Sequence, residues 1–332
     1  MAQASIAAAT AWAAQVLEAG GATAEVARLV ALALIAAEVD GLKGHGLSRL
    51  PTYVGMLASG KIDGRAVPMT SRPRPGALTI DAACGFAYPA IDLACRELPD
   101  MARAQGIALA AIGRSNHAGA IGHHVERLAD AGLVAIMLAN TPEAIAPWGG
   151  TRAVFGTNPI GFAAPLPGRA PVVVDLALSK VARGNIVAAK QKGEAIPLGW
   201  ALDAEGRPTT DANSALGGTM VAMGEAKGAA LALMVEVLAA ALVGAHLGFE
   251  ASSFLDENGA APETGQLIIA IDPGGLAHGR FGERMTTLAA AIEGQAGARL
   301  PGARRLDLRQ RAATGGLDVP DALLARFGAV TP

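Results

Sequence analysis

Residues 112–165 read IGRSNHAGAIGHHVERLADAGLVAIMLANTPEAIAPWGGTRAVFGTNPIGFAAP. The apolar run 107–112 predicts a buried strand, a polar Ser115-Asn116-His117 turn follows it, and residues 118–131 have a Gly-spaced helical pattern. Residues 133–138 predict a second buried strand, which ends at Asn140-Thr141-Pro142. Strand, helix and strand in succession indicate an α/β fold.

Two turns follow the second strand, Trp148-Gly149-Gly150 and Gly156-Thr157-Asn158-Pro159. Both are rich in residues that favour a positive φ or fix φ. Special backbone positions between strands are typical of a ligand site at the strand ends. The string GxGxxG does not occur in the chain, so an ordinary Rossmann fingerprint is absent, and so are a P-loop and a Gly-x-Ser-x-Gly elbow.

Short apolar strands alternate with helices along the rest of the chain. Residues 68–75 hold three prolines and predict an extended linker at a domain edge, and residues 301–305 predict a basic turn. Residues 197–211 predict a polar loop. Helices are expected at 4–18, 23–39, 47–58, 88–105, 179–192, 228–244, 281–295 and 320–327, and strands at 78–81, 171–175 and 266–272.

Length and composition bound the function. A chain of 332 residues, 52% of them apolar, can bury a large core and predicts two domains. A formal charge of −2 with no basic run of five or more residues argues against nucleic acid as a partner.

The expected location is the cytoplasm. Cys84 and Cys95 lie in apolar surroundings without a CxxC spacing, which favours buried free thiols in a reducing compartment. The N-terminus lacks the basic region of a signal peptide. The most membrane-like run, 229–247, has Glu236 at its centre, so we expect no membrane span and interpret Glu236 as a buried, paired carboxylate.

Two histidines are candidates for proton transfer. His45 lies between glycines, four residues before Arg49, whose guanidinium can bind a carboxylate in a fork; the alternative is a helix-capping histidine with a surface arginine. His117 ends a strand before a helix with Gly119 and Gly122, where backbone N–H groups can meet a pyrophosphate. The histidine spacing and the absence of HExxH predict no metal site.

Other charged residues have two interpretations each. Asp175 closes a strand, where it could orient a histidine, bind a ribose hydroxyl or cap the next helix. Lys227 at a helix start is unfavourable to the helix dipole, which suggests an anion there. Arg304 and Arg305 could grip a phosphate or form a solvated tail.

Long motifs of this chain match one family. The chain resembles, over nearly its whole length, the malate/L-lactate dehydrogenase family of NAD(P)-dependent oxidoreductases, which is unrelated to ordinary lactate dehydrogenase. That family includes ureidoglycolate and sulfolactate dehydrogenases and the Δ1-piperideine-2-carboxylate/Δ1-pyrroline-2-carboxylate reductases. The matching strings are GHGLSRLPTYVGMLASGKIDG, SNHAGAIGHHVERLADAGLVAIMLAN, APWGGTRAVFGTNPIGFAAP, VVDLALSKVARGNI, IPLGWALDAEGRPTTD, GEAKGAALALMVEVLAAALVG and TGQLIIAIDP.

The resemblance implies a non-Rossmann NAD(P)-binding fold with a mixed sheet. A helical substrate and dimerisation domain would be built from residues 1–75 and 280–332, the sheet domain from 76–279, and active sites would lie near the boundary of a homodimer. His45 resembles the catalytic acid/base, His117 a histidine that accepts the proton in some members, and Arg49 the residue that grips the substrate carboxylate. The implied cofactor contacts are His117, Ala118, Gly119, Ala120, Ile121, Asn140, Thr141, Asp175, Leu176, Ala177, Lys227, Pro301, Gly302, Arg304 and Arg305.

Two departures from the family pattern bear on the substrate. Many members have Ser before the His-Gly pair, and a Ser-His-Asp relay is proposed for the ketimine reductases; here Gly44 takes that position, so water or Ser48 would have to substitute. The ketimine branch tends to have Ala-His-Gly where this chain has Ala182-Arg183-Gly184. Arg183 suits a second anionic group on the substrate.

The expected function is hydride transfer between a nicotinamide and C2 of a 2-oxo or 2-hydroxy acid of the malate, lactate or sulfolactate type. His45 or His117 would transfer the proton and Arg49, Asp175 and Arg183 would complete the catalytic set. The basic pair Arg304-Arg305 favours NADP, with NAD possible. The alternatives are reduction of a cyclic ketimine acid to L-proline or L-pipecolate, and a non-catalytic carboxylate-binding protein, for which Gly44 is the one supporting feature.

Overall fold

A computed structural model describes residues 2–330 of the chain. Its centre is a seven-stranded mixed sheet with the order β2-β3-β4-β11-β5-β6-β7. The strands are β2 (Met69–Arg74), β3 (Ala77–Asp81), β4 (Ile107–Ser115), β5 (Val134–Ala139), β6 (Ile160–Leu166), β7 (Arg169–Leu176) and β11 (Thr264–Ile271). Within the described residues β3 and β4 are the one parallel pair of this sheet. A mostly antiparallel sheet is not a Rossmann sheet, which confirms the predicted mixed architecture.

The central strand β11 joins the two halves of the sheet. It pairs antiparallel with β4 on one side and β5 on the other, so that Gln266 faces Ile112 and Ala139. Ile268 and Ala270 point into the core on one face, and Leu267 and Ile269 point to the other face. The continuous apolar run 267–271 is expected of a strand covered on both faces.

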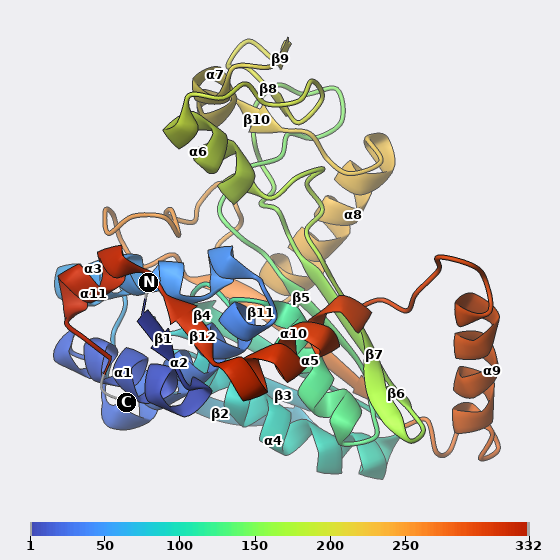
Figure 1. Ribbon diagram of the computed structural model, residues 1–332. Coiled ribbons are helices and arrows are strands. Elements are labelled where there is room, and N and C mark those ends of the chain that lie inside the picture. The colour runs from blue at the N-terminus through green and yellow to red at the C-terminus, as the bar shows by residue number, and fades with distance from the viewer. Residues whose placement is uncertain (1, 331–332) are drawn as a thin grey trace.

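Helices α4 (Ala87–Gln105) and α5 (Ile121–Asp130) cover one face of the sheet (Figure 1). Their buried side chains, such as Ile91, Leu98 and Val125, pack on Ile80 and Ile112 in one apolar cluster. Each fully buried aliphatic side chain of this kind contributes about 1.5–3 kcal/mol. This cluster holds the ends of β3, β4 and β7 in place and therefore fixes the loops that follow them.

The second face is covered by α8 (Ala226–Glu236), which continues as a π-helical turn, η3 (Val237–Ala241). A small lobe lies beyond it, at the top of Figure 1. It consists of α6 (Arg183–Lys192), α7 (Ala212–Gly217) and a three-stranded sheet of β8 (Ala201–Leu202), β9 (Pro208–Thr209) and β10 (Thr219–Met220).

The two ends of the chain meet in a separate apolar cluster. It unites α1 (Ile6–Ala19), α2 (Ala24–Val39) and α3 (Leu50–Ser59) with α11 (Asp321–Phe327), and β1 (Ala2–Ala4) pairs with β12 (Leu317–Val319). Helix α10 (Ala303–Gly315) runs from this cluster toward α5. Helix α9 (Phe281–Glu293) stands apart in Figure 1 and packs on β6 through Ala289.

Four expectations for local structure were wrong. Residues 69–74 form the edge strand β2, where prolines are tolerated because one side of the strand needs no ladder hydrogen bonds. Arg304 and Arg305 lie in the first turn of α10, not in a turn before a loop. Helix α6 begins at Arg183 rather than at residue 179, and α8 gives way to the π-helical turn after Glu236.

Cys84 and Cys95 are free thiols, and Cys95 is buried. Burial raises the pKa of Cys95 to about 11, so its thiol is neutral at ordinary pH. Within residues 2–330, every helix is too short or too polar to cross a membrane.

Candidate active site

The turn between α2 and α3 carries His45. Two short 3₁₀ turns, η1 (Lys43–His45) and η2 (Leu47–Arg49), replace the expected start of a helix at residue 47. The buried Glu38 carboxylate at the end of α2 accepts hydrogen bonds from Lys43 Nζ and from Leu47 N. A Cβ atom at Gly46 would lie 2.1 Å from Glu38 Oε2, so this turn needs glycine at 46. The carboxylate and Gly46 together fix the direction of the His45 side chain.

His117 follows β4. Its imidazole is hydrogen-bonded to Tyr53, which is in turn hydrogen-bonded to the chain's other tyrosine, Tyr88. Its Nδ1 lies 2.7 Å from the Tyr53 hydroxyl, and that hydroxyl lies 3.0 Å from the hydroxyl of Tyr88. All three side chains are buried. The Tyr53 hydroxyl therefore gives Nδ1 a buried hydrogen-bond partner and fixes the orientation of the imidazole.

The fold brings the two candidate histidines together. The rings of His45 and His117 are stacked, with centroids 5.4 Å apart and planes 14° from parallel. Burial, and then the charge of Arg49, lowers the pKa of His45 to about 4. The same two causes, with His45 as a third, hold the pKa of His117 well below its usual range. Both imidazoles are therefore neutral at neutral pH when no anion is bound.

Arg49 is aimed by two backbone carbonyls. Its Nε donates to Gly44 O at 2.9 Å, and its Nη1 donates to Phe254 O at 3.1 Å. The Phe254 ring packs edge-on against His117, with centroids 5.4 Å apart. An arginine fixed in this way beside two neutral imidazoles can bind a carboxylate and place the atoms next to it against a proton donor.

Sequence reasoning missed Tyr53, Tyr88 and Phe254. The printed sequence did contain one signal: the chain has only two tyrosines, and both contact this site. A scarce polar aromatic residue in an Ala- and Leu-rich chain marks a position where a hydroxyl is needed. Ser48, which with water was the expected substitute for the missing serine, donates to Lys43 O and makes no described contact with His45. The substitute for that serine stays a prediction.

The loop from His117 to Ile121 leads into α5, which begins without a side-chain cap. Gly119 has a φ of 67°, and the N–H of Gly122 donates to Asp175 Oδ2 at 2.9 Å. A Cβ at Gly122 would lie 2.8 Å from Asp175 Cβ and 3.1 Å from Arg305 Nη1, so these groups crowd around the helix start. The N–H groups of this helix start that Asp175 does not use, together with the arginine beside them, fit the phosphates of a dinucleotide.

Asp175 is exposed to solvent near the end of β7, although protein surrounds its carboxyl group on most sides. This burial raises the pKa of the Asp175 carboxyl, and the hydrogen bond from Gly122 opposes the increase. Leu176 and Ala177 follow it, half-buried, on the same strand end. Asp175 does not cap the next helix, because α6 has Ala182 at its N-cap and no side-chain cap; it binds the first turn of the earlier helix α5 instead.

Asn140 and Thr141, also expected at the cofactor, belong to a buried network. Asn140 Nδ2 donates to Glu236 Oε1 and His246 O, and its Oδ1 accepts from Gly265 N. Thr141 Oγ1 accepts from Thr157 N. Burial raises the pKa of Glu236, while hydrogen bonds, the first from Asn158 Nδ2, oppose the increase. Glu236 is the buried, paired carboxylate that the sequence predicted.

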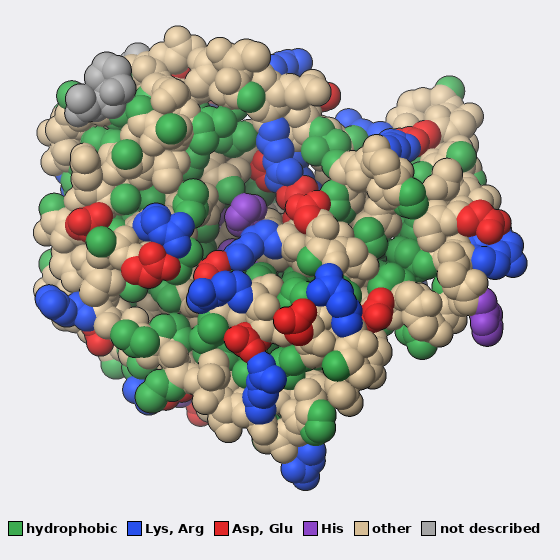
Figure 2. Space-filling view, turned by 90° about the horizontal axis from the view of Figure 1, so that it is seen from below, with side chains coloured by type: hydrophobic (Ala, Val, Ile, Leu, Met, Phe, Trp, Pro, Cys, Tyr) green, Lys and Arg blue, Asp and Glu red, His purple; other side chains and the backbone are tan. Residues whose placement is uncertain are grey.

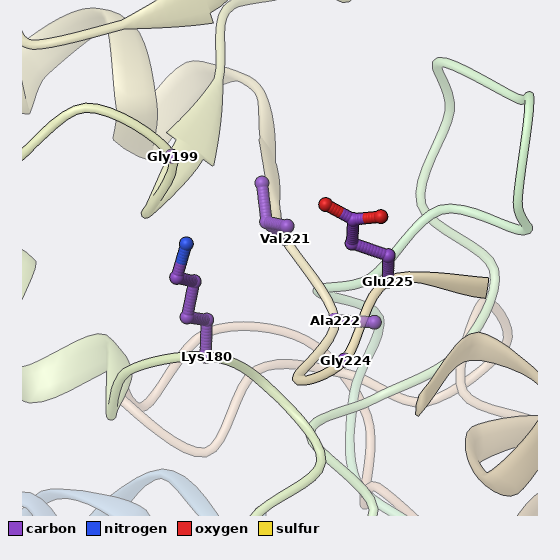
Figure 3. Close-up of a pocket in the computed structure, with 6 residues that line it drawn as sticks. All are labelled: Lys180, Gly199, Val221, Ala222, Gly224 and Glu225. Atoms are coloured by element: carbon purple, nitrogen blue, oxygen red, sulfur yellow. The ribbon is translucent and has the colours of Figure 1, made fainter. Parts of the chain in front are cut away.

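Arg183 and Lys227 make no described contact with His45 or Arg49. Burial lowers the pKa of Arg183, and the charge of Glu143 partly offsets this effect. Lys227 is exposed in the first turn of α8. Beside that turn lies a pocket of about 340 Å³, into which Lys180 and Glu225 extend from two segments (Figure 3).

The residues expected at a phosphate lie around the start of α10. Gly302, with a φ of 84°, precedes the helix, Pro301 and Arg304 are exposed, and Arg305 Nη1 lies 3.8 Å from Asp40 Oδ2. Figure 2 shows basic and acidic side chains interspersed around a hollow that contains histidine, and no wide basic surface on that face. Among the described residues, no group of three or more His, Cys, Asp or Glu side chains is arranged to hold a metal ion.

Comparison with known proteins now defines the class. Residues 4–327 match the family model described as malate/L-lactate dehydrogenase. The chain belongs to this family and is an oxidoreductase. It is 49% identical over 308 residues to the (2R)-3-sulfolactate dehydrogenase (NADP(+)) of Chromohalobacter salexigens, covering 93% of this chain and 92% of that protein. It is 41% identical to the Δ1-pyrroline-2-carboxylate/Δ1-piperideine-2-carboxylate reductase of Pseudomonas putida, covering 91% and 89%.

Solved structures agree. The Δ1-piperideine-2-carboxylate reductase of Pseudomonas syringae superimposes with a TM-score of 0.94 at 37% identity, over the whole of both chains. The sulfolactate dehydrogenase of Methanocaldococcus jannaschii superimposes with a TM-score of 0.89 at 27% identity, over 98% of this chain and 95% of that one. The fold is therefore the one that the sequence motifs indicated.

Proposed function

We propose that the protein reduces, with NADPH, a 2-oxo acid that carries a second anionic group, and oxidises the corresponding 2-hydroxy acid in reverse. The observation that carries this proposal is the guanidinium of Arg49, aimed beside the stacked His45 and His117. The sulfolactate type is favoured by the 49% identical relative, and Arg183 supplies a cation for the second anion.

In the proposed reaction Arg49 binds the C1 carboxylate and so orients the neighbouring carbonyl, a positioning effect. His45 donates the proton to the oxygen on C2 and takes it back in the reverse direction. NADPH, bound along residues 117–121, the start of α5 and Arg304-Arg305, would supply the hydride to C2. General acid–base help from one histidine is worth about 10²–10⁴-fold in rate.

His45 is a better proton donor than His117 in this geometry. His117 is buried and its Nδ1 is occupied by Tyr53, while His45 is only half-buried and can exchange protons with solvent. A carboxylate on Arg49 would neutralise the charge that helps to lower the pKa of His45. Substrate binding would therefore raise this pKa and prepare the imidazole to carry a proton.

A second candidate function is reduction of a cyclic ketimine acid to L-proline or L-pipecolate. The named activities of the Pseudomonas putida relative and of the Pseudomonas syringae structure favour it. It uses the same Arg49 and His45 and leaves Arg183 without an anion. The expected remote alternative, a non-catalytic binding protein, had only the absence of a serine at Gly44 in its favour, and membership of the oxidoreductase family argues against it. A Cβ at Gly44 would meet nothing within 4 Å, so the backbone does not require glycine there.

We also propose a homodimer formed through α8. The outer side of α8 and the turn after it expose a run of large apolar side chains with 37–61% of their surface accessible: Leu231, Leu233, Met234, Val237 and Leu242. Contiguous apolar surface of this kind is typical of a protein–protein interface. The predicted helical domain of residues 1–75 and 280–332, beside a sheet domain of 76–279, stays a proposal. The pairing of β1 with β12 and the apolar cluster of α1–α3 with α11 support a helical unit built from both ends of the chain, while β2 and α9 pack with the sheet. The proposed location is the cytoplasm.

The decisive experiment measures oxidation of NADPH and of NADH, by absorbance of the reduced nicotinamide, against four substrates. These are pyruvate, oxaloacetate, sulfopyruvate and Δ1-piperideine-2-carboxylate. Higher kcat/KM for oxaloacetate or sulfopyruvate than for pyruvate supports the dianion proposal. Preference for the cyclic imine contradicts it, and tight NADPH binding without any turnover contradicts both enzymatic proposals.

A further inference from the structure

Lys61 is a buried lysine that the proposed mechanism does not use. It follows α3 and the left-handed cap Gly60, and its side chain has no exposed surface. Its Nζ donates to three backbone carbonyls, those of Ser253 at 2.7 Å, Asp256 at 3.1 Å and Asn258 at 2.6 Å. A buried ammonium with all three donors used is fully hydrogen-bonded, which is what makes its burial tolerable.

The three carbonyls belong to one loop, residues 253–258, which we call the Phe254 loop. The loop has little other structure: Ser253 Oγ accepts from Leu255 N, and Asp256 Oδ1 accepts from Asn258 N. Lys61 is thus the group around which its carbonyls converge. Glu257 packs over Gly55 of α3, where an added Cβ would lie 3.3 Å from Glu257 Oε2, so the loop lies against the helix that follows Arg49.

The Phe254 loop reaches both working groups of the candidate site. The Phe254 carbonyl accepts one of the two backbone-directed hydrogen bonds of Arg49, and the Phe254 ring packs on His117. Lys61 therefore contacts the loop directly and Arg49 only through it. The position of the Arg49 guanidinium thus depends on the Phe254 carbonyl, and the loop that carries this carbonyl is bound by the Lys61 ammonium.

We propose that Lys61 is a positioning residue, whose ammonium organises the Phe254 loop and thereby aims Arg49 at the substrate carboxylate. This proposal rests on the proposed function for the identity of that carboxylate, and on the contacts above for the rest. A compact ammonium with three rotatable donors suits three converging carbonyls. Without it the three part-buried carbonyls would lose their shared donor, so the loop would turn toward water and Arg49 would lose the Phe254 carbonyl.

The experiment compares wild type with Lys61→Met, an apolar side chain of similar length. The control is Met101→Ala, which removes a buried core side chain near the end of α4, about 20 Å along the helix from Tyr88 at its start. The measurements are kcat and KM for the oxo acid, the Kd for NADPH from its fluorescence, and hydrogen exchange of the peptide that contains the Phe254 loop. Arg49→Lys and the double variant Lys61→Met/Arg49→Lys complete a cycle.

Lys61→Met is expected to raise KM for the oxo acid about tenfold with a smaller change in kcat, since it weakens substrate positioning. The NADPH Kd stays within about twofold, because separate contacts hold the cofactor. Hydrogen exchange of the peptide that contains the Phe254 loop should become faster in Lys61→Met. When Arg49 is already replaced by Lys, adding Lys61→Met should change KM by less than about twofold, because the two residues act through the same contact. Lys61→Arg keeps the charge and the donors, so its KM should lie between those of wild type and Lys61→Met.

A merely structural role would give a different pattern. The proposal would be overturned if Lys61→Met and Met101→Ala changed KM by the same factor when they lower Tm equally. It would also be overturned if the effects of Lys61→Met and Arg49→Lys on KM were additive. If Lys61→Met does not fold, Lys61→Gln, with two donors and no charge, takes its place with the same criteria. If wild type turns over no substrate, the proposed function fails; the Lys61 proposal then stands or falls on loop exchange, which must rise in the Lys61 variant and not in Met101→Ala.

Discussion

The imidazoles of His45 and His117 lie nearly parallel, with centroids 5.4 Å apart, although one precedes α3 and the other follows β4. The stack has an outer and an inner member. His45 reaches solvent from a turn fixed by Glu38, and His117 is buried on two tyrosine hydroxyls. The asymmetry separates two roles, proton exchange with the substrate by His45 and fixed support by His117.

Replacement of His45 by Asn is expected to lower kcat by about 10²–10⁴-fold, because the proton donor is lost. His117→Asn should lower kcat by a smaller factor, because it removes the support beneath His45. Steady-state kinetics in both directions measure these effects. If neither His45→Ala nor His117→Ala lowers kcat at least about tenfold, the proposed proton transfer is wrong.

Tyr53→Phe removes the hydroxyl that binds His117 Nδ1 and leaves that nitrogen buried without a partner. We expect kcat to fall about 5- to 15-fold, the equivalent of one hydrogen bond of about 1–1.5 kcal/mol. KM for the oxo acid should change little, since Arg49 keeps its two carbonyl contacts. Tyr88→Phe, one hydrogen bond further from the imidazole, is the matched control and should have a smaller effect. Equal effects of the two would contradict a specific role for the Tyr53 hydroxyl at His117 Nδ1.

The free energy of unfolding should fall in mild acid. The folded pKa of His45 is about 4 and that of His124 about 3, both depressed mainly by burial, against an ordinary value of 6.5. As pH falls through 6.5, the unfolded chain binds protons that the folded protein does not, so stability is lost until the folded pKa is reached. Each histidine contributes up to about 1.4 kcal/mol per pH unit within that window.

Urea unfolding at pH 7, 6 and 5 measures this slope in wild type and in His124→Gln. The variant, which lacks the titrating ring, should show a shallower loss. His278→Gln, on an exposed segment, is the control and should keep the wild-type slope. The prediction fails if His124→Gln and wild type lose stability in parallel between pH 7 and pH 5.

Arg183→Ala tests whether Arg183 binds the second anionic group of the substrate. KM for oxaloacetate or sulfopyruvate should rise about 10- to 100-fold, the usual weight of a charge-assisted hydrogen bond, while KM for pyruvate stays unchanged. Arg183→Lys should recover part of the loss, because it keeps the charge without the fork. A uniform loss on all three substrates would show that Arg183 does not distinguish anions.

Leu233→Glu with Val237→Glu places two charges on the exposed apolar side of α8. If this surface is the dimer interface, sedimentation velocity should show a monomer at concentrations where wild type is a dimer, since buried unpaired charges oppose association. Leu276→Glu, at an equally apolar and exposed position before α9, should leave the dimer intact. A dimeric double variant would place the interface elsewhere.

Sequence patterns predicted the sheet well because its strands are short apolar runs. The runs at 107–112, 133–138, 171–175 and 266–272 all became strands of the sheet. Helix α10 was missed because Ala312 is its one buried residue, so no apolar stripe marks the helical period. The strands β1 and β12 are three residues long and exist only because the chain ends meet.

The site was predicted in part, for a physical reason. His45, Arg49 and His117 carry functional groups that are recognisable in sequence, and the fold brings them together. Phe254 and Lys61 act through a ring face and through contacts with backbone carbonyls, which no local spacing encodes. The roles expected for Asp175, Lys227 and the other cofactor positions stay predictions.

The central position of β11 has a consequence for how the chain reaches this fold. The strand that fills the gap between β4 and β5 is encoded at residues 264–271, long after both neighbours have been synthesised. Until then the two halves of the sheet each present an unpaired strand edge, and such edges are templates for aggregation. A closing contact so distant in sequence slows folding. A nascent chain that stops before residue 264 would therefore be prone to aggregation and in need of chaperones, whatever the stability of the completed protein.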